Sequence, residues 1–467
     1  MAETSRVALR FTDGGKSTAR LAELVAARQR AFDADALAAR ALAYPPAQLD
    51  ETPYEGVTCE LRERAPHEPA QRARSLTDAP RVLRKALEAV VERTLGDAQC
   101  VGVMAGGGLD SAGLLALAVE WARPRGATVF AVALDFAGRC DDRPYLRMLE
   151  KALACEVIRV TPEEGARHLQ WIRGVDAAPF CWPSAPMEME MMARARQRGA
   201  DCVLSGIGGD ELFDGEPRAL AAYARRGEVL TAIRSARRLR GFWRPRSRTL
   251  SWIVRPLVAR LTPAALRVEL ARRARPSAPI WAGPGLEGYL ERLHERDLRA
   301  LERDLRSGAG VSEPGAGEPH RMHVAWIRHQ SEIVAGIDRR DPFLDRELVA
   351  TVAGFEPEWL LHGGIRRGLF REALRDLLPR AVLEREDKAF FEPAFLRMTQ
   401  AAEGLEAMRE LSSGEELASL GLVEPGRFRA AFDAFIAAPD DGPSWMTIWP
   451  ALCVERFLRA SRARATA

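Results

Sequence analysis

The stretch Val101-Gly-Val-Met-Ala-Gly-Gly-Gly-Leu-Asp-Ser111 decides the fold of this chain. An apolar run typical of a β-strand ends at three consecutive glycines, and a run typical of a helix follows over residues 112–119. Glycines let backbone N–H groups approach phosphate oxygens, and the start of a helix adds positive potential. Asp110 adds a carboxylate that suits Mg²⁺ bound to such a phosphate. No Lys follows the glycines, so this is not a Walker loop; the plain alternative is a glycine turn without a ligand.

A second turn of the same kind lies downstream, in Val203-Leu-Ser-Gly-Ile-Gly-Gly-Asp-Glu-Leu-Phe213. Again an apolar strand-like run ends at glycines, and Asp210 and Glu211 open a helix-like run. Two carboxylate-bearing turns at the ends of two strands can face one polyphosphate from both sides. The pair therefore predicts a nucleotide bound with Mg²⁺.

The chain around these turns alternates between the patterns of strands and helices. Strands are expected at residues 99–104, 128–134, 156–160 and 201–204, and helices at residues 86–95, 112–121, 144–154 and 187–198. This alternation predicts an α/β fold with a doubly wound parallel sheet, which binds ligands at the carboxyl ends of its strands. The C-terminal part has helical patterning and ends in a helix over residues 445–460. Before the sheet, we expect one helix over residues 21–43 and a strand over residues 57–61.

Composition excludes several classes of protein. The net charge of +3 over 467 residues gives no sign of nucleic-acid binding, and 47% hydrophobic residues are ample for a buried core. The chain has neither a signal-peptide pattern nor an apolar run long enough to span a membrane. Its seven cysteines form no Cys-x-x-Cys pair, which argues against zinc and fits a reducing compartment. We therefore expect a cytoplasmic protein with no nucleic-acid or membrane partner.

Four motifs resemble those of the synthetase domain of the asparagine synthetase family, a class of ATP pyrophosphatases. The two glycine turns match the signatures Ser-Gly-Gly-x-Asp-Ser and Ser-Gly-x-Gly-(Gly/Ser/Ala)-Asp-Glu. The third motif, Arg-x-Pro-Phe-Leu-Asp, stands here at Arg340–Asp345, and the fourth runs from Arg366 through Leu377-Leu-Pro379 to Lys388. Their order and spacing match over most of the chain, from about residue 77 to residue 458.

The resemblance implies an ATP-dependent carbon–nitrogen ligase that works in two steps. A substrate carboxylate attacks the α-phosphate of ATP, pyrophosphate leaves, and an acyl-adenylate forms. An amine then displaces AMP and an amide results. ATP and Mg²⁺ are the cofactors implied.

Roles for individual residues follow from the same resemblance. Asp110 and Asp210 are the expected Mg²⁺ ligands, because charge builds on the leaving pyrophosphate; capping of its helix is the alternative role of Asp110. Lys388 is the expected catalytic cation, which stabilises charge on the α-phosphate and on the tetrahedral intermediate. Gly106 replaces the usual serine of the motif and removes one hydroxyl contact. The residues expected to bind nucleotide are Met104, Gly106, Gly107, Gly108, Asp110, Ser111, Leu134, Asp135 and Gly206.

Ile207 departs from the pattern of the asparagine-forming members, which carry a glutamate at this position. Isoleucine can neither accept a proton nor bind ammonium, so the second half-reaction should differ from theirs. An apolar residue suits a larger substrate, or an amine that is deprotonated elsewhere. Glu332 is the candidate general base, with His329 and Asp338 as alternatives.

The N-terminal segment differs from that of complete asparagine synthetases, which begin with a glutaminase domain whose cysteine follows the initiator methionine. Ala2 stands in that place here, and the first cysteine is Cys59. We expect residues 1–75 to be a truncated remnant of that domain, residues 76–460 to form the synthetase-like domain, and glutamine not to be the nitrogen donor.

Three interpretations of the reaction remain open. The chain is most similar to lasso-peptide cyclases, which join the N-terminal amine of a ribosomal peptide to an Asp or Glu side chain as a macrolactam. The expected partners are then a peptide substrate, a leader-peptide-binding protein and a leader protease. The second interpretation is a glutamine-independent amide ligase, either a β-lactam synthetase-like enzyme on a small carboxylate or an asparagine synthetase that uses ammonia. The third is a catalytically silent adenylate-binding or scaffold protein.

Overall fold

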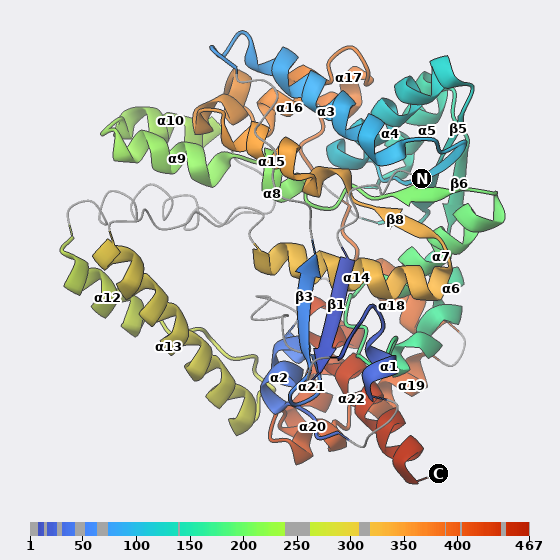
Figure 1. Ribbon diagram of the computed structural model, residues 1–467, viewed down its shortest axis with the longest axis vertical. Helices are drawn as coiled ribbons and strands as arrows, with labels where there is room; N and C mark the ends of the chain where they lie inside the picture. Colours follow the sequence, from blue (N-terminus) through green and yellow to red (C-terminus); the bar gives the residue numbers. More distant parts are fainter. Residues whose placement is uncertain are drawn as a thin grey trace.

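A five-stranded parallel sheet forms the centre of the computed structural model (Figure 1). Its strands are β4 (Cys100–Met104), β5 (Thr128–Leu134), β6 (Val157–Val160), β7 (Cys202–Leu204) and β8 (Asp338–Arg340), in the order β6-β5-β4-β7-β8. Every neighbouring pair is parallel. The predicted α/β fold with a doubly wound parallel sheet is thus confirmed. The structure describes residues 8–13, 16–25, 30–42, 52–62, 73–138, 141–238, 262–307, 318–387, 389–401, 404–439 and 445–466.

The order in which strands are added to the sheet reverses at β4. β4 is the first strand of this sheet in the sequence; β5 and β6 are added on one side of it, and β7 and β8 are then added on the other side. In sheets of this kind the crossovers next to such a reversal leave a crevice at the carboxyl ends of the strands, where ligands bind. The crevice expected here lies between the ends of β4 and β7, and these are the strands that lead into the two glycine turns.

The sheet is covered by helices on both faces, because its strand residues alternate between two apolar cores. Val101 and Val103 face a core that includes α3 (Ala79–Leu95), α4 (Leu109–Ala122) and α16 (Gly368–Ala373). Phe130 and Val132 face the opposite core, with α7 (Ala185–Gln197) and the end of α14 (Glu318–Ala335). Figure 1 shows α3 and α4 on one side of the sheet and α14 on the other.

The predicted helices around the sheet are confirmed, and their starts are shifted. α3 begins at Ala79, before the predicted residue 86, because Pro80 in its first turn favours helix initiation. α4 begins at Leu109, inside the glycine motif, rather than at residue 112. The helices between the strands are α5 (Arg143–Leu153), α6 (Pro162–Gly165) and η2 (Ala166–Arg173), followed by α7. The helices between β7 and α14 are α8 (Gly209–Phe213), α9 (Glu216–Arg225), α10 (Val229–Arg238), α12 (Ala264–Arg273) and α13 (Pro284–Ser307).

The N-terminal segment forms a separate antiparallel sheet in the order β2-β1-β3. The strands are β1 (Ala8–Asp13), β2 (Lys16–Thr18) and β3 (Thr58–Arg62), so the strand predicted at 57–61 is confirmed and β1 and β2 went unpredicted. The single helix predicted over 21–43 is wrong, since α1 (Leu21–Val25) and α2 (Ala34–Leu42) are separate. Between them Phe32 forms a β-bridge with Tyr54, and the Asp33 carboxylate accepts the Ala36 N–H at 2.9 Å, which starts a new helix.

Helices make up the remainder of the chain after β8. They are η3 (Pro342–Leu344), α15 (Arg346–Ala353), η4 (Pro357–Gly364), α16, α17 (Arg380–Leu383), α18 (Glu392–Gln400), α19 (Gly404–Leu411), α20 (Glu415–Ser419), α21 (Pro425–Ala437) and α22 (Trp445–Thr466). The last of these confirms the predicted C-terminal helix. None of the helices within the described ranges is long and apolar enough to cross a membrane.

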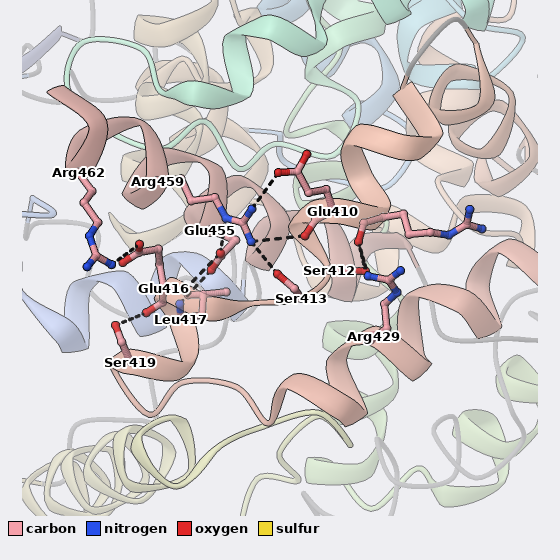
Figure 2. Close-up of polar contacts among 11 residues, drawn as sticks. Glu410, Ser412, Ser413, Glu416, Leu417, Ser419, Arg429, Glu455, Arg459 and Arg462 are labelled. Carbon is pink, nitrogen blue, oxygen red and sulfur yellow. Dashed lines mark hydrogen bonds and ion pairs between the residues drawn. The ribbon is translucent and has the colours of Figure 1, made fainter. Parts of the chain in front are cut away.

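A buried carboxylate holds the C-terminal helices together (Figure 2). Glu455 on α22 has no exposed surface, and it accepts the Leu417 N–H at 2.9 Å at the start of α20. Arg459 donates to the same carboxylate at 2.7 Å and to Ser413 at 2.7 Å. Because a buried charge is tolerated only when it is paired and hydrogen-bonded, this network fixes the position of α20 on α22.

Candidate active site

The two glycine turns touch each other at the carboxyl ends of β4 and β7. A Cβ atom added to Gly206 would lie 3.3 Å from the Ser111 backbone nitrogen. One added to Gly209 would lie 2.7 Å from the Asp110 Cγ. The contact at Gly206 would be tight for a side chain and the contact at Gly209 would force a shift, so glycine at these positions lets the turns meet. The two motifs therefore form one site at the crevice that the strand order predicts.

The first turn is closed by its own serine. The Ser111 hydroxyl accepts the Gly106 N–H at 3.0 Å and lies 3.4 Å from the carbonyl oxygens of Gly106 and Gly108. Gly108, in an extended conformation, precedes α4 as its N-cap residue, and Asp110 lies in the first turn of the helix. The N-terminus of this 14-residue helix therefore points its free N–H groups and its positive dipole end into the crevice.

Asp110 and Asp210, the predicted Mg²⁺ ligands, converge on one cation, the guanidinium of Arg367. Nη1 of Arg367 lies 2.7 Å and 2.8 Å from the two Asp110 carboxylate oxygens, and Nη2 forms an ion pair with Asp210. Two carboxylates that face a shared positive charge fit a divalent cation that also binds phosphate oxygens and water. The described residues contain no group of three or more His, Cys, Asp or Glu side chains that could hold a metal alone.

Arg385 covers the first glycine turn from the other side. Its guanidinium lies 2.6 Å from Asp142, 2.6 Å from Asp387 and 4.1 Å from the centre of the Tyr145 ring. A Cβ on Gly107 would collide with this guanidinium. Burial opposes the charge, but the two carboxylates hold the pKa of Arg385 above its usual value. A fixed positive charge therefore lies against the turn that is expected to bind phosphate.

The second turn rests on a buried ion network centred on Arg339. This side chain is 2% exposed, and it donates to Ser205 at 3.1 Å, Glu188 at 2.9 Å and Asp341 at 3.2 Å. Burial lowers the pKa of the guanidinium, yet Asp341 and Glu188 outweigh burial and raise it above its usual value. The Ser205 hydroxyl in turn accepts the Ile207 N–H at 3.2 Å, so Arg339 orients the turn.

The expected nucleotide contacts on β4 and β5 lie beside the first turn. Met104 ends β4 in register with Val132, and Leu134 ends β5 with a half-buried side chain. Asp135 follows β5, donates its N–H to the Val160 carbonyl at 2.7 Å and lies 3.9 Å from Arg143. The strand ends thus place Met104, Leu134 and Asp135 on the same edge of the sheet as the glycine turns.

The predicted general base, Glu332, lies beside β8. Glu332, on α14, accepts the Arg339 N–H at 3.0 Å and also interacts with Asp338, the first residue of β8. Asp338 is in register with Cys202, the first residue of β7, so these carboxylates lie toward the start of the strands rather than at their ends. Burial raises the pKa of Glu332 to about 7. The contacts that place Glu332 are thus made to β8, and its role as general base stays a prediction.

His329, an alternative general base, contacts the N-terminal part of the chain. His329 bonds to Asp176 at 2.8 Å and packs against Phe11 of the N-terminal sheet. Lys388, the expected catalytic cation, lies outside the described residues, between Asp387 and Ala389. Its catalytic role stays a prediction.

Three arginines of the site were missed by sequence reasoning: Arg339, Arg367 and Arg385. A signal was present for two of them, because Arg367 and Arg385 lie within the fourth motif, between Arg366 and Lys388. The third motif begins at Arg340, which pairs with Asp338, so the local sequence pointed to Arg340 rather than to Arg339. Only the partners reveal the difference, and these come from distant parts of the chain.

Fold and site together define a nucleotide-binding α/β protein with paired glycine turns and carboxylates at the strand ends. The family model for asparagine synthase matches residues 82–458, and the chain therefore belongs to the asparagine synthase family. Enzymes of this family are ATP-dependent ligases that form amides, so this chain is an enzyme of the asparagine synthetase type.

Two further comparisons add little to the family match. Curated protein sequences give no match. Among solved structures, the U34-tRNA thiolase NcsA from Methanococcus maripaludis is 16% identical, with 47% of this chain and 80% of that chain covered and a TM-score of 0.23.

Proposed function

We propose that this enzyme closes a macrolactam in a ribosomal peptide, by joining an amine of the peptide to one of its Asp or Glu side chains at the expense of ATP. The observation that carries this proposal is Ile207. It lies at the meeting point of the two glycine turns, half-buried, and offers no polar atom of its side chain to ammonium. An aliphatic residue at this point favours a large acyl substrate whose amine arrives on the same molecule.

In the first half-reaction, a carboxylate oxygen of the peptide attacks the α-phosphorus of ATP. The bond from this phosphorus to the oxygen of the leaving pyrophosphate breaks, and an acyl-adenylate forms. Asp110 and Asp210 would hold Mg²⁺, which neutralises charge on the leaving pyrophosphate. The N-terminus of α4, with its free N–H groups, and the nearby Arg385 provide further positive potential at the first turn.

In the second half-reaction, the peptide amine attacks the acyl carbon, and AMP leaves with the electron pair of the broken acyl–phosphate bond. The attacking nitrogen loses one proton to a base. Lys388 would stabilise the negative charge of the tetrahedral intermediate. Because both reacting groups belong to one peptide, holding it folded in the crevice raises their effective concentration and replaces a second substrate.

The test is a product analysis with synthetic peptides. Each peptide carries a free N-terminal amine and one Asp or Glu, placed at successive positions in the set. The purified chain is incubated with ATP, Mg²⁺ and each peptide, and pyrophosphate, AMP and peptide mass are measured. A peptide that becomes lighter by one water, with its N-terminal amine blocked, is the expected product.

Two parallel incubations distinguish the other interpretations. Aspartate with ammonia should give no asparagine, and its appearance would make the chain an ammonia-dependent asparagine synthetase. Turnover of a small carboxylate in place of all peptides would favour a small-molecule amide ligase. Asp110→Asn is the catalytic control, and it should remove pyrophosphate release while the circular dichroism spectrum stays unchanged. A leader-peptide-binding protein and a leader protease are the partners we propose, and their addition forms a further arm of the experiment.

A further inference from the structure

Arg367 occupies the point at which the two metal-ligand candidates meet. Its side chain is 7% exposed, and the Asp110 side chain that it contacts is 13% exposed. One guanidinium nitrogen spans both oxygens of Asp110 and another pairs with Asp210. The two carboxylates therefore share one positive charge that belongs to the protein itself.

The backbone around Arg367 holds it in this place. Arg367 has φ of 54°, in the left-handed region that residues other than glycine rarely adopt, and it is the N-cap residue of α16. The next residue, Gly368, is packed so closely against the His362 carbonyl that a Cβ would collide with it. A non-glycine residue keeps such a conformation only where its surroundings impose it, which happens most often at functional sites.

A divalent cation that enters the site without nucleotide meets two obstacles. Arg367 already occupies the carboxylates, and its charge repels the incoming cation. The described part of the chain adds no third His, Cys, Asp or Glu side chain to them, whereas Mg²⁺ requires six oxygens in a nearly octahedral arrangement. Phosphate oxygens would remove both obstacles, because they supply ligands and also attract the guanidinium.

We propose that Arg367 is a resident counter-ion that excludes divalent cations from the nucleotide-free enzyme and transfers to a phosphate when nucleotide and metal enter together. Metal and nucleotide then bind as one unit, and free Mg²⁺ has little affinity for the empty site. This inference uses Asp110 and Asp210 as the metal ligands of the proposed function, but it does not depend on which amide is formed.

The test measures Mn²⁺ binding by electron paramagnetic resonance, with purified protein and no substrate. Wild-type protein should bind Mn²⁺ weakly without nucleotide and tightly with α,β-methylene-ATP, which is not cleaved at the α-phosphate. Arg367→Gln should bind Mn²⁺ alone more tightly than wild type, by at least about tenfold, because it removes the positive charge that pairs with both carboxylates. Adding Asp110→Asn to this variant should reverse the gain.

Arg366→Gln is the matched control. Arg366 is the neighbouring residue, and its guanidinium pairs with Asp214 at 2.8 Å and 3.1 Å. Its loss should leave Mn²⁺ affinity at the wild-type level. Circular dichroism and thermal melting identify any variant that does not fold.

Two results would overturn the inference. One is tight Mn²⁺ binding by wild-type protein in the absence of nucleotide, a measurement that needs no variant. The other is equal Mn²⁺ affinity of wild type and folded Arg367→Gln. Because neither readout involves peptide or amide product, a failure of the proposed function leaves this test intact.

Discussion

Arg339 offers the sharpest test of how the site is built. Arg339→Met removes a buried guanidinium and keeps a side chain of similar length. It leaves the Glu188 and Asp341 carboxylates, whose side chains are 18% and 2% exposed, without their cation. One oxygen of Asp341, Oδ2, already lacks a hydrogen-bond partner in the structure, so this carboxylate is poorly compensated even in the wild type.

The expected magnitude follows from these contacts. Removing one partner of a buried ion pair typically costs about 3–5 kcal/mol, because the charge left behind is uncompensated. Arg339→Met should therefore lower the free energy of unfolding by about 3–5 kcal/mol. It should also weaken ATP binding, because the hydroxyl of Ser205 in the second glycine turn loses its donor.

Urea denaturation followed by tryptophan fluorescence measures the loss, and isothermal titration with ATP measures binding. Arg339→Met combined with Asp341→Asn should recover part of the lost stability, because the second change removes the buried negative charge. Arg380→Met is the exposed control, since Arg380 pairs with Glu384 at the surface. An unfolding free energy of Arg339→Met within about 1 kcal/mol of wild type would refute the argument for a buried network.

Three further predictions concern packing, pH and the C-terminal helices. Gly107→Ala should lower the free energy of unfolding by about 1–3 kcal/mol, because its Cβ collides with a fixed guanidinium; Gly108→Ala should have little effect, since nothing lies within 4 Å of its Cβ. Burial raises the pKa of Glu332 from 4.5 to about 7. Below about pH 4.5 this carboxyl is protonated in the folded and the unfolded state and does not destabilise the fold, whereas the free energy of unfolding falls as the pH rises through 7. Glu332→Gln should therefore match wild type near pH 4.5 and exceed its stability at pH 8 by about 1–3 kcal/mol. Glu455→Ala should lower the free energy of unfolding by roughly 2–4 kcal/mol, because two backbone N–H groups and an arginine lose their buried partner. Arg462→Ala should have no measurable effect on it, since the Arg462 side chain is exposed where it pairs with Glu416 (Figure 2).

Urea denaturation of each variant provides the measurement for all three. Equal stability of Gly107→Ala and Gly108→Ala would contradict the close packing over the first turn. A stability difference between wild type and Glu332→Gln that does not change with pH would contradict the raised pKa. A loss in Glu455→Ala no larger than that in Arg462→Ala would show that the buried carboxylate does not hold α20.

The sequence by itself determined both glycine turns and the strands of the parallel sheet except β8, which was not predicted. These depend on local patterns, because an apolar run that stops at glycines and is followed by a helical run is readable within a dozen residues. The family motifs extended this reading to Asp110 and Asp210, which the structure brings to one point. The helix predicted over 21–43 failed because a pairing with the distant Tyr54 interrupts it.

Only the tertiary structure decided which charges the site contains. The Arg367 guanidinium reaches Asp110 from 257 positions away along the chain, and Arg339 reaches Glu188 across 151 positions. No pattern of neighbouring residues encodes such pairs, because the energy of a charge pair depends on the distance between the charges in space and not on their separation along the chain. The register of β8 against β7, which places Asp338 and its neighbour Glu332 toward the start of these strands, likewise depends on residues far apart in the sequence.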